Sequence, residues 1–216
     1  MSVATTTVAV ADYGMGNLRS VEKALGCVGA AAQVTSDPSR LTRADGVVLP
    51  GVGAFPRAMQ EIGALGLAES LRERAESGLP LLGICLGMQL LFERSAELGG
   101  AEGLGLLAGT VERLPAEGLK LPQIGWNSVA WARPSGLAAG LPDPCAFYHV
   151  HSFAPIPTDT ADVAGRADYG APFASAVERD HVWGVQFHPE KSGPHGLRLL
   201  ENFVALAADG SARRAA

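Results

Sequence analysis

The sequence predicts an α/β protein, with a mostly parallel sheet covered by helices on both faces and antiparallel strands added in the second half. Three observations lead to this prediction. In the first half, short apolar runs alternate with segments of helical periodicity. One apolar run enters a Gly-x-Cys-x-Gly turn at residues 83–87 and leads directly into a helical pattern. The second half instead carries short strand-like runs separated by turn residues, a pattern typical of antiparallel pairing.

The first half is expected to supply the parallel strands and their helices. Each expected strand is a short apolar run, and each expected helix repeats its apolar residues at intervals of three and four. The expected strands are Thr7–Ala11, Ala32–Thr35, Gly46–Leu49 and the run entering Gly83 from Pro80; the expected helices are Leu18–Gly26, Phe55–Leu65, Leu67–Ser77 and one starting over Met88–Glu93.

The second half is expected to add antiparallel strands to the edge of this sheet, followed by one closing helix. The strands are expected at Gly109–Leu114, Ser128–Trp131, Ala146–His151, Ser175–Glu178 and His181–Phe187, and the helix at Gly196–Ala208. Since no repeat, low-complexity tract or linker interrupts the chain, we expect a single domain over residues 1–216.

Composition excludes several classes of function. The chain has 216 residues, 47% of them hydrophobic, which is enough for a sizeable core. Its net charge of −5 argues against nucleic-acid or membrane-surface partners. The three cysteines show no C-x-x-C spacing, so neither a metal site nor a disulfide framework is expected, and no other cofactor. With no signal-peptide pattern and no membrane-length apolar run, we expect a cytoplasmic protein.

The turn at residues 83–87 has the pattern of a nucleophile elbow, with Cys85 as the nucleophile. A strand that becomes a helix at one residue leaves little room for β-carbons, which explains the flanking glycines. The following helix N-terminus favours the thiolate form of the cysteine, and the N–H of Leu86 is placed to stabilise an oxyanion. For this turn in isolation, a buried structural cysteine is an equally good interpretation.

A base and a group that orients it occur together in Phe187-His188-Pro189-Glu190, directly after an expected strand. One short loop can present the imidazole and the carboxylate, and the carboxylate can hold the ring tautomer. Taken alone, this pair is better explained as a turn histidine beside a solvated glutamate. The cysteine elbow changes that balance, because catalytic groups collect at the carboxyl ends of such strands.

The segment Pro50–Phe55 follows another expected strand and contains two glycines, Gly51 and Gly53. Glycines allow backbone N–H groups to approach a substrate or to flip, which suits the second half of an oxyanion hole. For the glycines alone, an ordinary strand-to-helix loop is the simpler interpretation.

Together these motifs resemble a known family. Residues 83–89 (Gly-Ile-Cys-Leu-Gly-Met-Gln), with Phe-His-Pro-Glu-Lys at 187–191, resemble the signature of class I, or triad, glutamine amidotransferases. Within that class, residues 12–18, 49–55, 125–127 and 148–152 resemble the glutaminase subunits of imidazole glycerol phosphate synthase. The resemblance covers about residues 7–207 and implies a flavodoxin-like sheet in one glutamine amidotransferase type 1 domain.

The resemblance implies a catalytic role for each motif. Cys85 attacks the side-chain amide of glutamine and forms a glutamyl thioester, while His188 moves the protons and Glu190 orients it. The oxyanion hole is formed by Leu86 together with Gly51 and Val52, whose peptide is expected to face away until the partner's nucleotide ligand favours its flip.

The resemblance also implies the glutamine contacts. Gln89 and Glu97 match residues that hold the substrate, and the backbone at Ser152 and Phe153 matches contacts to its α-groups. The family pattern has tyrosine where this chain has Phe153. A backbone contact survives that difference, whereas a hydroxyl contact does not.

A separate partner is expected, because the chain ends soon after the triad motif and free ammonia would escape. The resemblance implies a heterodimer with a cyclase subunit, a (β/α)₈ barrel that takes ammonia to make imidazole glycerol phosphate and an aminoimidazole carboxamide ribonucleotide in histidine biosynthesis. An exposed Trp126 in a loop is the strongest candidate interface anchor. The residues that match or neighbour partner-facing positions are Asn17, Gln123, Trp126, Asn127, Tyr148 and Lys191.

Other functions stay open at this point. The runner-up is another class I amidotransferase subunit, for example one that feeds pyridoxal or anthranilate synthesis. A stand-alone γ-glutamyl cysteine hydrolase would need no partner, and Gly125-Trp126-Asn127 would then have no role. An idle binding subunit is disfavoured by the intact Cys85, His188 and Glu190.

Overall fold

The computed structural model describes the backbone of residues 5–215 and the side chains of residues 5–211. The strands are β1 (Thr7–Ala11), β2 (Ala31–Thr35), β3 (Gly46–Gly51), β4 (Leu81–Cys85), β5 (Phe92–Ser95), β6 (Ala101–Glu102), β7 (Leu107–Arg113), β8 (Gln123–Trp131), β9 (Cys145–His151), β10 (Phe153–Pro157), β11 (Val163–Asp168), β12 (Pro172–Arg179) and β13 (Val182–Val185). The α-helices are α1 (Leu18–Cys27), α2 (Pro38–Arg43), α3 (Phe55–Ala64), α4 (Leu67–Glu76), α5 (Leu86–Leu90) and α6 (Gly193–Ala215).

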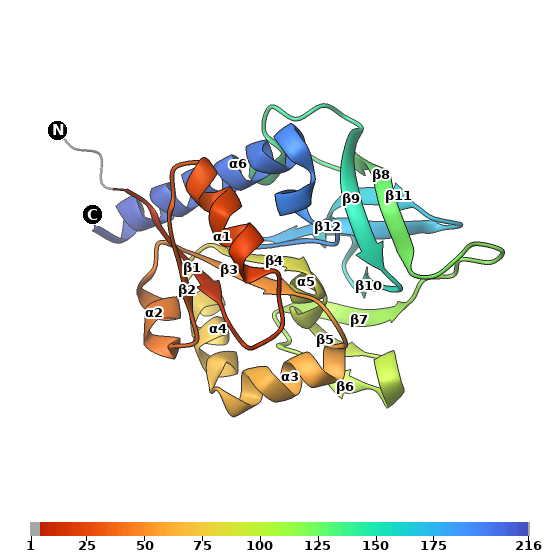
Figure 1. Ribbon diagram of the computed structural model, residues 1–216, viewed down its shortest axis with the longest axis horizontal. Coiled ribbons are helices and arrows are strands. Elements are labelled where there is room, and N and C mark those ends of the chain that lie inside the picture. The colour runs from red at the N-terminus through yellow and green to blue at the C-terminus, as the bar shows by residue number, and fades with distance from the viewer. Residues whose placement is uncertain (1–4, 216) are drawn as a thin grey trace.

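Nine strands form the main sheet, in the order β2-β1-β3-β4-β13-β12-β11-β8-β9 (Figure 1). The first five in this order are mutually parallel. Their arrangement is that of a flavodoxin-like sheet, with β13 in the place of the fifth strand. The predicted α/β class, with a mostly parallel sheet and additional antiparallel strands, is therefore confirmed.

The sequence predicted that the second-half strands all add to the edge of the main sheet, and this prediction is wrong. β13 is parallel to β4 and lies near the middle of the sheet, because its continuous apolar run is buried on both faces. Four other strands form a separate sheet in the order β10-β7-β5-β6. Short apolar runs reveal that a segment is a strand, but not its direction or its neighbours.

Three local predictions are also corrected. The helix after the elbow, α5, is only five residues long, and Phe92 already begins β5 because that segment pairs with β7. Residues 125–127 lie within strand β8 and not in a loop. Helix α2 was not predicted, although Asp37 caps it through the N–H of Ser39 and Pro38 occupies its first turn.

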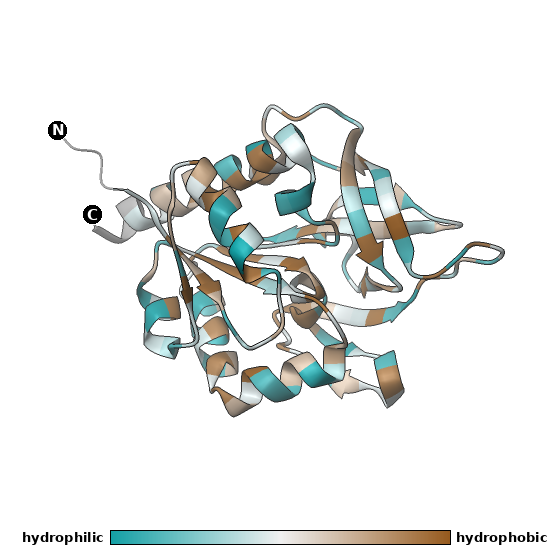
Figure 2. Ribbon diagram, in the orientation of Figure 1, coloured by the Kyte–Doolittle hydropathy of each residue, from teal (hydrophilic) through white to brown (hydrophobic). Residues whose placement is uncertain are grey.

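The helices cover the sheet on both faces, and each face has its own apolar cluster. Alternate residues of β1 serve the two clusters, with Val8 and Val10 on one side and Ala9 and Ala11 on the other. Helices α1 and α6 supply Val21, Leu25, Leu200 and Phe203 to the first cluster; α2, α3 and α4 supply Leu41, Ile62 and Leu71 to the second. Figure 2 shows the hydrophobic residues concentrated along the central strands.

With both faces covered, the carboxyl ends of the parallel strands are the place where polar groups can meet a ligand. β1, β3, β4 and β13 all end at this edge. Cys85 is the last residue of β4, and Tyr13, Val52 and His188 follow the other three strands. Among the described residues, no helix combines the length and apolarity needed to cross a membrane.

Candidate active site

Cys85 lies at the junction of β4 and α5, with no loop between them. Its backbone has φ 55° and ψ −113°, a conformation that a residue with a side chain rarely adopts. A β-carbon on Gly87 would lie 1.8 Å from the carbonyl oxygen of Leu49, and one on Gly83 would lie 2.6 Å from that of Gly87. The predicted elbow is thus present, and its glycines are required by contact with neighbouring backbone.

His188 and Glu190 follow β13, the strand next to β4, and meet each other at the predicted site. His188 Nδ1 lies 3.0 Å from Glu190 Oε1, and both side chains are almost completely buried. The loop is held because the His188 N–H donates to the Tyr148 carbonyl (2.8 Å) and Ser192 Oγ donates to the His188 carbonyl (2.6 Å). The first bond ties the loop to β9, and the second closes the loop on itself.

The imidazole also interacts with Cys85, at the end of the neighbouring strand β4. Burial disfavours the charged ring, but the interactions with Cys85 and with Glu190 outweigh it and raise the pKa of His188 to about 9. The arrangement therefore favours an imidazolium beside the sulfur with the carboxylate behind it, which suits a cysteine nucleophile.

The sulfur has two further polar neighbours. Val150 O lies 3.7 Å from Cys85 Sγ, and the amide Nε2 of Gln186 donates to that sulfur at 3.8 Å. Gln186 is 0% exposed. We did not predict it from the sequence, although a glutamine inside an apolar strand next to the histidine motif is a signal for a specific polar contact.

The expected oxyanion residues surround the cysteine. Leu86 begins α5, and Gly51 is the register partner of Cys85 across the β3–β4 pair. Val52 is 42% exposed and forms part of the cleft wall beside Gly53, whose φ is 98°. The nucleophile and the two-glycine segment are therefore adjacent, as expected from the sequence.

Two hydrogen bonds hold the ends of this two-glycine segment. At its start, the buried Tyr13 hydroxyl donates to the Pro50 carbonyl (2.8 Å). At its end, the Phe55 N–H donates to Glu97 Oε2 (2.8 Å). Burial, and then the charge of Cys85, raise the pKa of Tyr13 far above its usual value, so the phenol stays a donor. Tyr13 was not among the predicted site residues.

A cleft of about 270 Å³ opens over Cys85. All four residues expected to contact glutamine line it, together with the triad histidine. Gln89 Nε2 donates to the Phe153 carbonyl and to Gln186 Oε1, both at 3.0 Å. The expected residues in the lining are Gln89, Glu97, Ser152 and Phe153.

His151 also lines the cleft and was not predicted as a site residue. Its Nδ1 donates to the Phe153 carbonyl (2.8 Å), while its buried Nε2 has no hydrogen-bond partner among the described residues. Burial lowers its pKa to about 4, so the ring is neutral and Nε2 is an acceptor. The neighbouring His149 is instead bonded at both nitrogens, to Phe147 O and Ser175 Oγ, which indicates a structural role.

The residues that were expected to face a partner differ in exposure and direction. Trp126 is 60% exposed, and its ring meets that of Tyr148 edge-on at 6.2 Å. Asn127 points to the opposite face of β8, where it donates to Asp168 O. Gln123 is only 3% exposed, so the expectation that its side chain faces a partner is wrong. Strand β8 alternates its side chains between two faces, and Asn127, which is half-buried, stays a predicted partner contact. Asn17, half-buried, precedes α1, and the exposed Lys191 lines the cleft.

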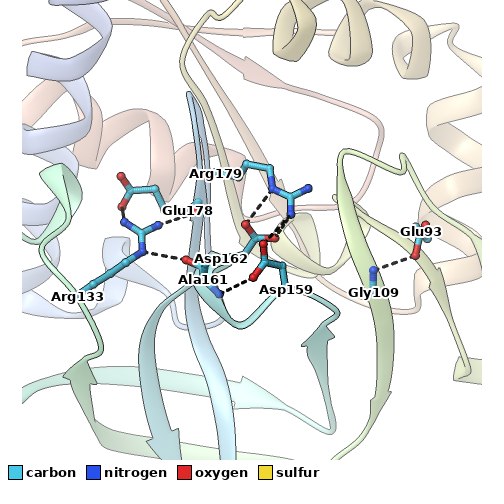
Figure 3. Close-up of polar contacts among 8 residues, drawn as sticks. All are labelled: Glu93, Gly109, Arg133, Asp159, Ala161, Asp162, Glu178 and Arg179. Atoms are coloured by element: carbon cyan, nitrogen blue, oxygen red, sulfur yellow. Dashed lines mark hydrogen bonds and ion pairs between the residues drawn. The ribbon is translucent and has the colours of Figure 1, made fainter.

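A second polar cluster lies around β12, apart from the residues that line the cleft (Figure 3). Arg179 pairs with Asp162 (2.6 Å), and Arg133 reaches the carbonyl and carboxylate of Glu178. Because these charges satisfy one another, we assign the cluster a structural role. No group of three or more His, Cys, Asp or Glu side chains within the described part of the chain is arranged to hold a metal ion.

Comparison with known proteins identifies the family. The class-I glutamine amidotransferase model matches residues 9–207. The chain is 52% identical over 199 residues to the imidazole glycerol phosphate synthase subunit HisH of Moorella thermoacetica, covering 92% of this chain and 94% of the relative. It belongs to the HisH family of class-I glutamine amidotransferases. The HisH subunit of Wolinella succinogenes is 50% identical over 203 residues, covering 92% and 99% of the two chains.

Solved structures agree on the fold of this HisH-family chain. A glutamine amidotransferase crystal structure superposes with a TM-score of 0.73 at 22% identity, covering 93% of this chain and 98% of the other. The PurLQS structure from Thermotoga maritima gives 0.73 at 20% identity, with the same coverage. At these identities the likeness concerns the fold alone.

Proposed function

We propose that this chain is the glutaminase subunit of an imidazole glycerol phosphate synthase and acts as one glutamine amidotransferase domain. The observation that carries the proposal is the position of His188, which is bonded to Glu190 and interacts with Cys85, the two triad residues Cys85 and His188 both lining the cleft. This is the arrangement that activates a thiol toward a carbonyl carbon.

In the first half of the reaction, the Cys85 thiolate attacks the side-chain amide carbon of glutamine. The carbonyl oxygen becomes an oxyanion, which the N–H of Leu86 and a backbone N–H of the Gly51–Val52 segment stabilise. His188 gives its proton to the amide nitrogen, the C–N bond breaks, and ammonia leaves. The product on the enzyme is a γ-glutamyl thioester of Cys85.

In the second half, neutral His188 takes a proton from water, and the resulting hydroxide attacks the thioester carbon. The C–S bond breaks, glutamate is released, and the thiolate–imidazolium pair is restored. Glu190 holds the Nδ1 side of the ring throughout, which keeps Nε2 directed at the reacting atoms.

Ammonia passes to a separate cyclase subunit in this proposal, which the subunit name of the relatives supports. The exposed Trp126 and the half-buried Tyr148 supply an aromatic pair for that contact. The backbone of Tyr148 also bonds the triad loop, since its carbonyl accepts from His188 N–H and its N–H donates to Ser192 Oγ. A partner that moves β9 would therefore act directly on the histidine.

The decisive experiment is a glutaminase assay of the chain alone, with the cyclase subunit, and with the cyclase subunit and its nucleotide substrate. We expect low release of glutamate from the isolated chain and a large increase in the complete mixture. Equal turnover under all three conditions would instead identify a stand-alone hydrolase.

A matched pair of variants tests this surface in a binding experiment with the cyclase subunit. Trp126→Ala should weaken cyclase binding by about 2 kcal/mol, measured by titration calorimetry, because a central exposed aromatic anchor is removed. Ile156→Ala removes a similarly exposed apolar residue from β10 and should bind like the parent chain. Equal affinity of both variants would place the interface elsewhere.

A further inference from the structure

The Phe153 carbonyl sets the orientation of several side chains around the nucleophile. It accepts hydrogen bonds from Gln89 Nε2 (3.0 Å) and from His151 Nδ1 (2.8 Å). The carbonyl is itself fixed, because Phe153 pairs with Arg113 in the β10–β7 ladder. A carbonyl can only accept, so the nitrogen end of the Gln89 amide must point toward Phe153.

The orientation of the Gln89 amide fixes the orientation of a second side-chain amide, that of Gln186. The other hydrogen of Gln89 Nε2 is donated to Gln186 Oε1 at 3.0 Å. Gln186 must therefore turn its oxygen toward Gln89 and its nitrogen the opposite way. On that side lies Cys85 Sγ, 3.8 Å from Gln186 Nε2. One backbone carbonyl thus decides which end of a fully buried amide faces the sulfur.

We infer that Gln186 is a positioning residue of the glutaminase reaction, held by Gln89 and Phe153 so that its N–H is directed at the Cys85 sulfur. The catalytic role of Gln186 rests on the proposed function, whereas its contact with the Cys85 sulfur is present in the chain without substrate. The N–H stabilises negative charge on the sulfur, in addition to the N-terminus of α5.

The hydrogen bonds that link Phe153 O, Gln89 and Gln186 also determine which atom Gln89 presents to the cleft. Both hydrogens of Gln89 are used inside the protein, so the atom that it can offer to a ligand is its oxygen. Gln89 thereby accepts from the N–H groups of a bound glutamine, in the direction that the Phe153 carbonyl sets and that the bond to Gln186 supports.

Two substitutions of Gln186 distinguish its contact with Cys85 from its contact with Gln89. Gln186→Glu keeps the size of the side chain and an acceptor for Gln89, but it turns an oxygen toward the sulfur. Gln186→Met keeps the length and removes both contacts. We expect kcat of glutamine hydrolysis in the cyclase complex to fall about tenfold or more in both variants. KM should change less than threefold in Gln186→Glu and should rise in Gln186→Met.

Thiol reactivity gives a readout that requires neither glutamine nor the partner. Iodoacetamide labelling is measured by mass spectrometry of the Cys85 peptide, in a Cys27→Ser background because Cys27 is exposed. We expect both variants to label Cys85 about tenfold more slowly at pH 7, with the rate profile moved to higher pH. Ser175→Ala is the matched control, since it removes a fully buried polar side chain bonded to His149 and should label at the parent rate.

Labelling rates and kcat of both variants within twofold of the parent would overturn the inference. Thermal unfolding verifies that each variant folds, and Gln186→Glu decides alone if Gln186→Met does not fold, because it preserves volume and polarity. If the parent complex releases no glutamate, the proposed function fails, whereas the labelling result still decides whether Gln186 acts on the sulfur.

Discussion

Cys85 is the last residue of β4 and Val52 directly follows the neighbouring parallel strand β3, and the segments at these two strand ends differ in exposure. The elbow is enclosed: the residues from Leu81 to Leu91 are all buried, and neither Gly83 nor Gly87 has room for a β-carbon. The segment Gly51–Ala54 has an exposed Val52 and a left-handed Gly53, and hydrogen bonds are found at its two ends, from Tyr13 and to Glu97.

The difference separates two tasks of the site. The strained Cys85 conformation, of a kind that costs on the order of 1–3 kcal/mol, is held by close packing and is present before any ligand arrives. We expect the Gly51–Val52 peptide to flip between these two anchors, although Gly51 itself packs against the elbow, where a β-carbon on it would lie 2.9 Å from Gly87 N. With such a flip, a partner controls the rate through the oxyanion donor and does not move the cysteine.

The largest effect is expected from removing the nucleophile. Cys85→Ala should reduce glutaminase activity by at least about 10³-fold, with or without the cyclase subunit, because no thioester can form. Calorimetric titration should still detect the complex, since the elbow backbone is unchanged. Cys27→Ser, at an exposed thiol, is the control and should retain activity. Residual turnover by Cys85→Ala would remove Cys85 from the mechanism.

Packing at the elbow predicts the next largest effect. Gly87→Ala places a β-carbon 1.8 Å from Leu49 O and should lower the free energy of unfolding by more than about 3 kcal/mol, measured by chemical denaturation. Gly63→Ala is the matched control, because a β-carbon in that position of α3 meets nothing within 4 Å. It should change stability by under about 1 kcal/mol, in the stabilising direction. Similar values for both would mean that the elbow is not enclosed.

The buried histidine predicts a pH dependence of stability. The pKa of His188 is raised in the folded chain from 6.5 to about 9, so its contribution is complete below pH 6.5 and is lost as the pH rises through 9. Over that interval the free energy of unfolding should fall by about 1–3 kcal/mol. His188→Asn should remove this slope in denaturation measured from pH 6 to pH 10. An unchanged slope in the variant would assign the titration to another group.

The smallest effect is expected from the hydrogen bond that holds the start of the Gly51–Ala54 segment. Tyr13→Phe removes the donor to the Pro50 carbonyl and should lower partner-stimulated turnover about fivefold, corresponding to one hydrogen bond. Labelling of Cys85 by iodoacetamide should stay unchanged, because the elbow is independently packed. Tyr169→Phe removes a comparable hydroxyl–carbonyl bond, to Lys120 O, and serves as the control. A parallel loss of labelling would show that the two regions are not separate.

Local sequence predicted the site motifs and most of the first-half elements. Strand β1 has the predicted bounds, and α1, α3 and α4 end one residue from them. The elements were predictable because an elbow, a His-Pro-Glu turn and an amphipathic helix are each encoded within a few consecutive residues. The glutamine contacts implied by the family resemblance, Gln89, Glu97, Ser152 and Phe153, line the cleft with Cys85 and His188 and stay predictions.

Other site residues could not be predicted because their contacts join distant parts of the chain. Gln186 meets Gln89 and Cys85 across about a hundred residues, and Tyr13 reaches Pro50 across 37. The direction of β13 and the burial of Gln123 likewise depend on which strands become neighbours. The role of a buried polar side chain can be assigned only when its hydrogen-bond partner is known.

The sequence by itself determined that Cys85 stands at a sharp strand-to-helix turn and that a His-Pro-Glu loop and a two-glycine loop exist to serve it. The tertiary structure alone decided that β3, β4 and β13 are adjacent and parallel, so that these three segments meet at one edge. The physical reason is that backbone sterics act between consecutive residues, whereas strand pairing and buried hydrogen bonds act between residues that only folding brings together.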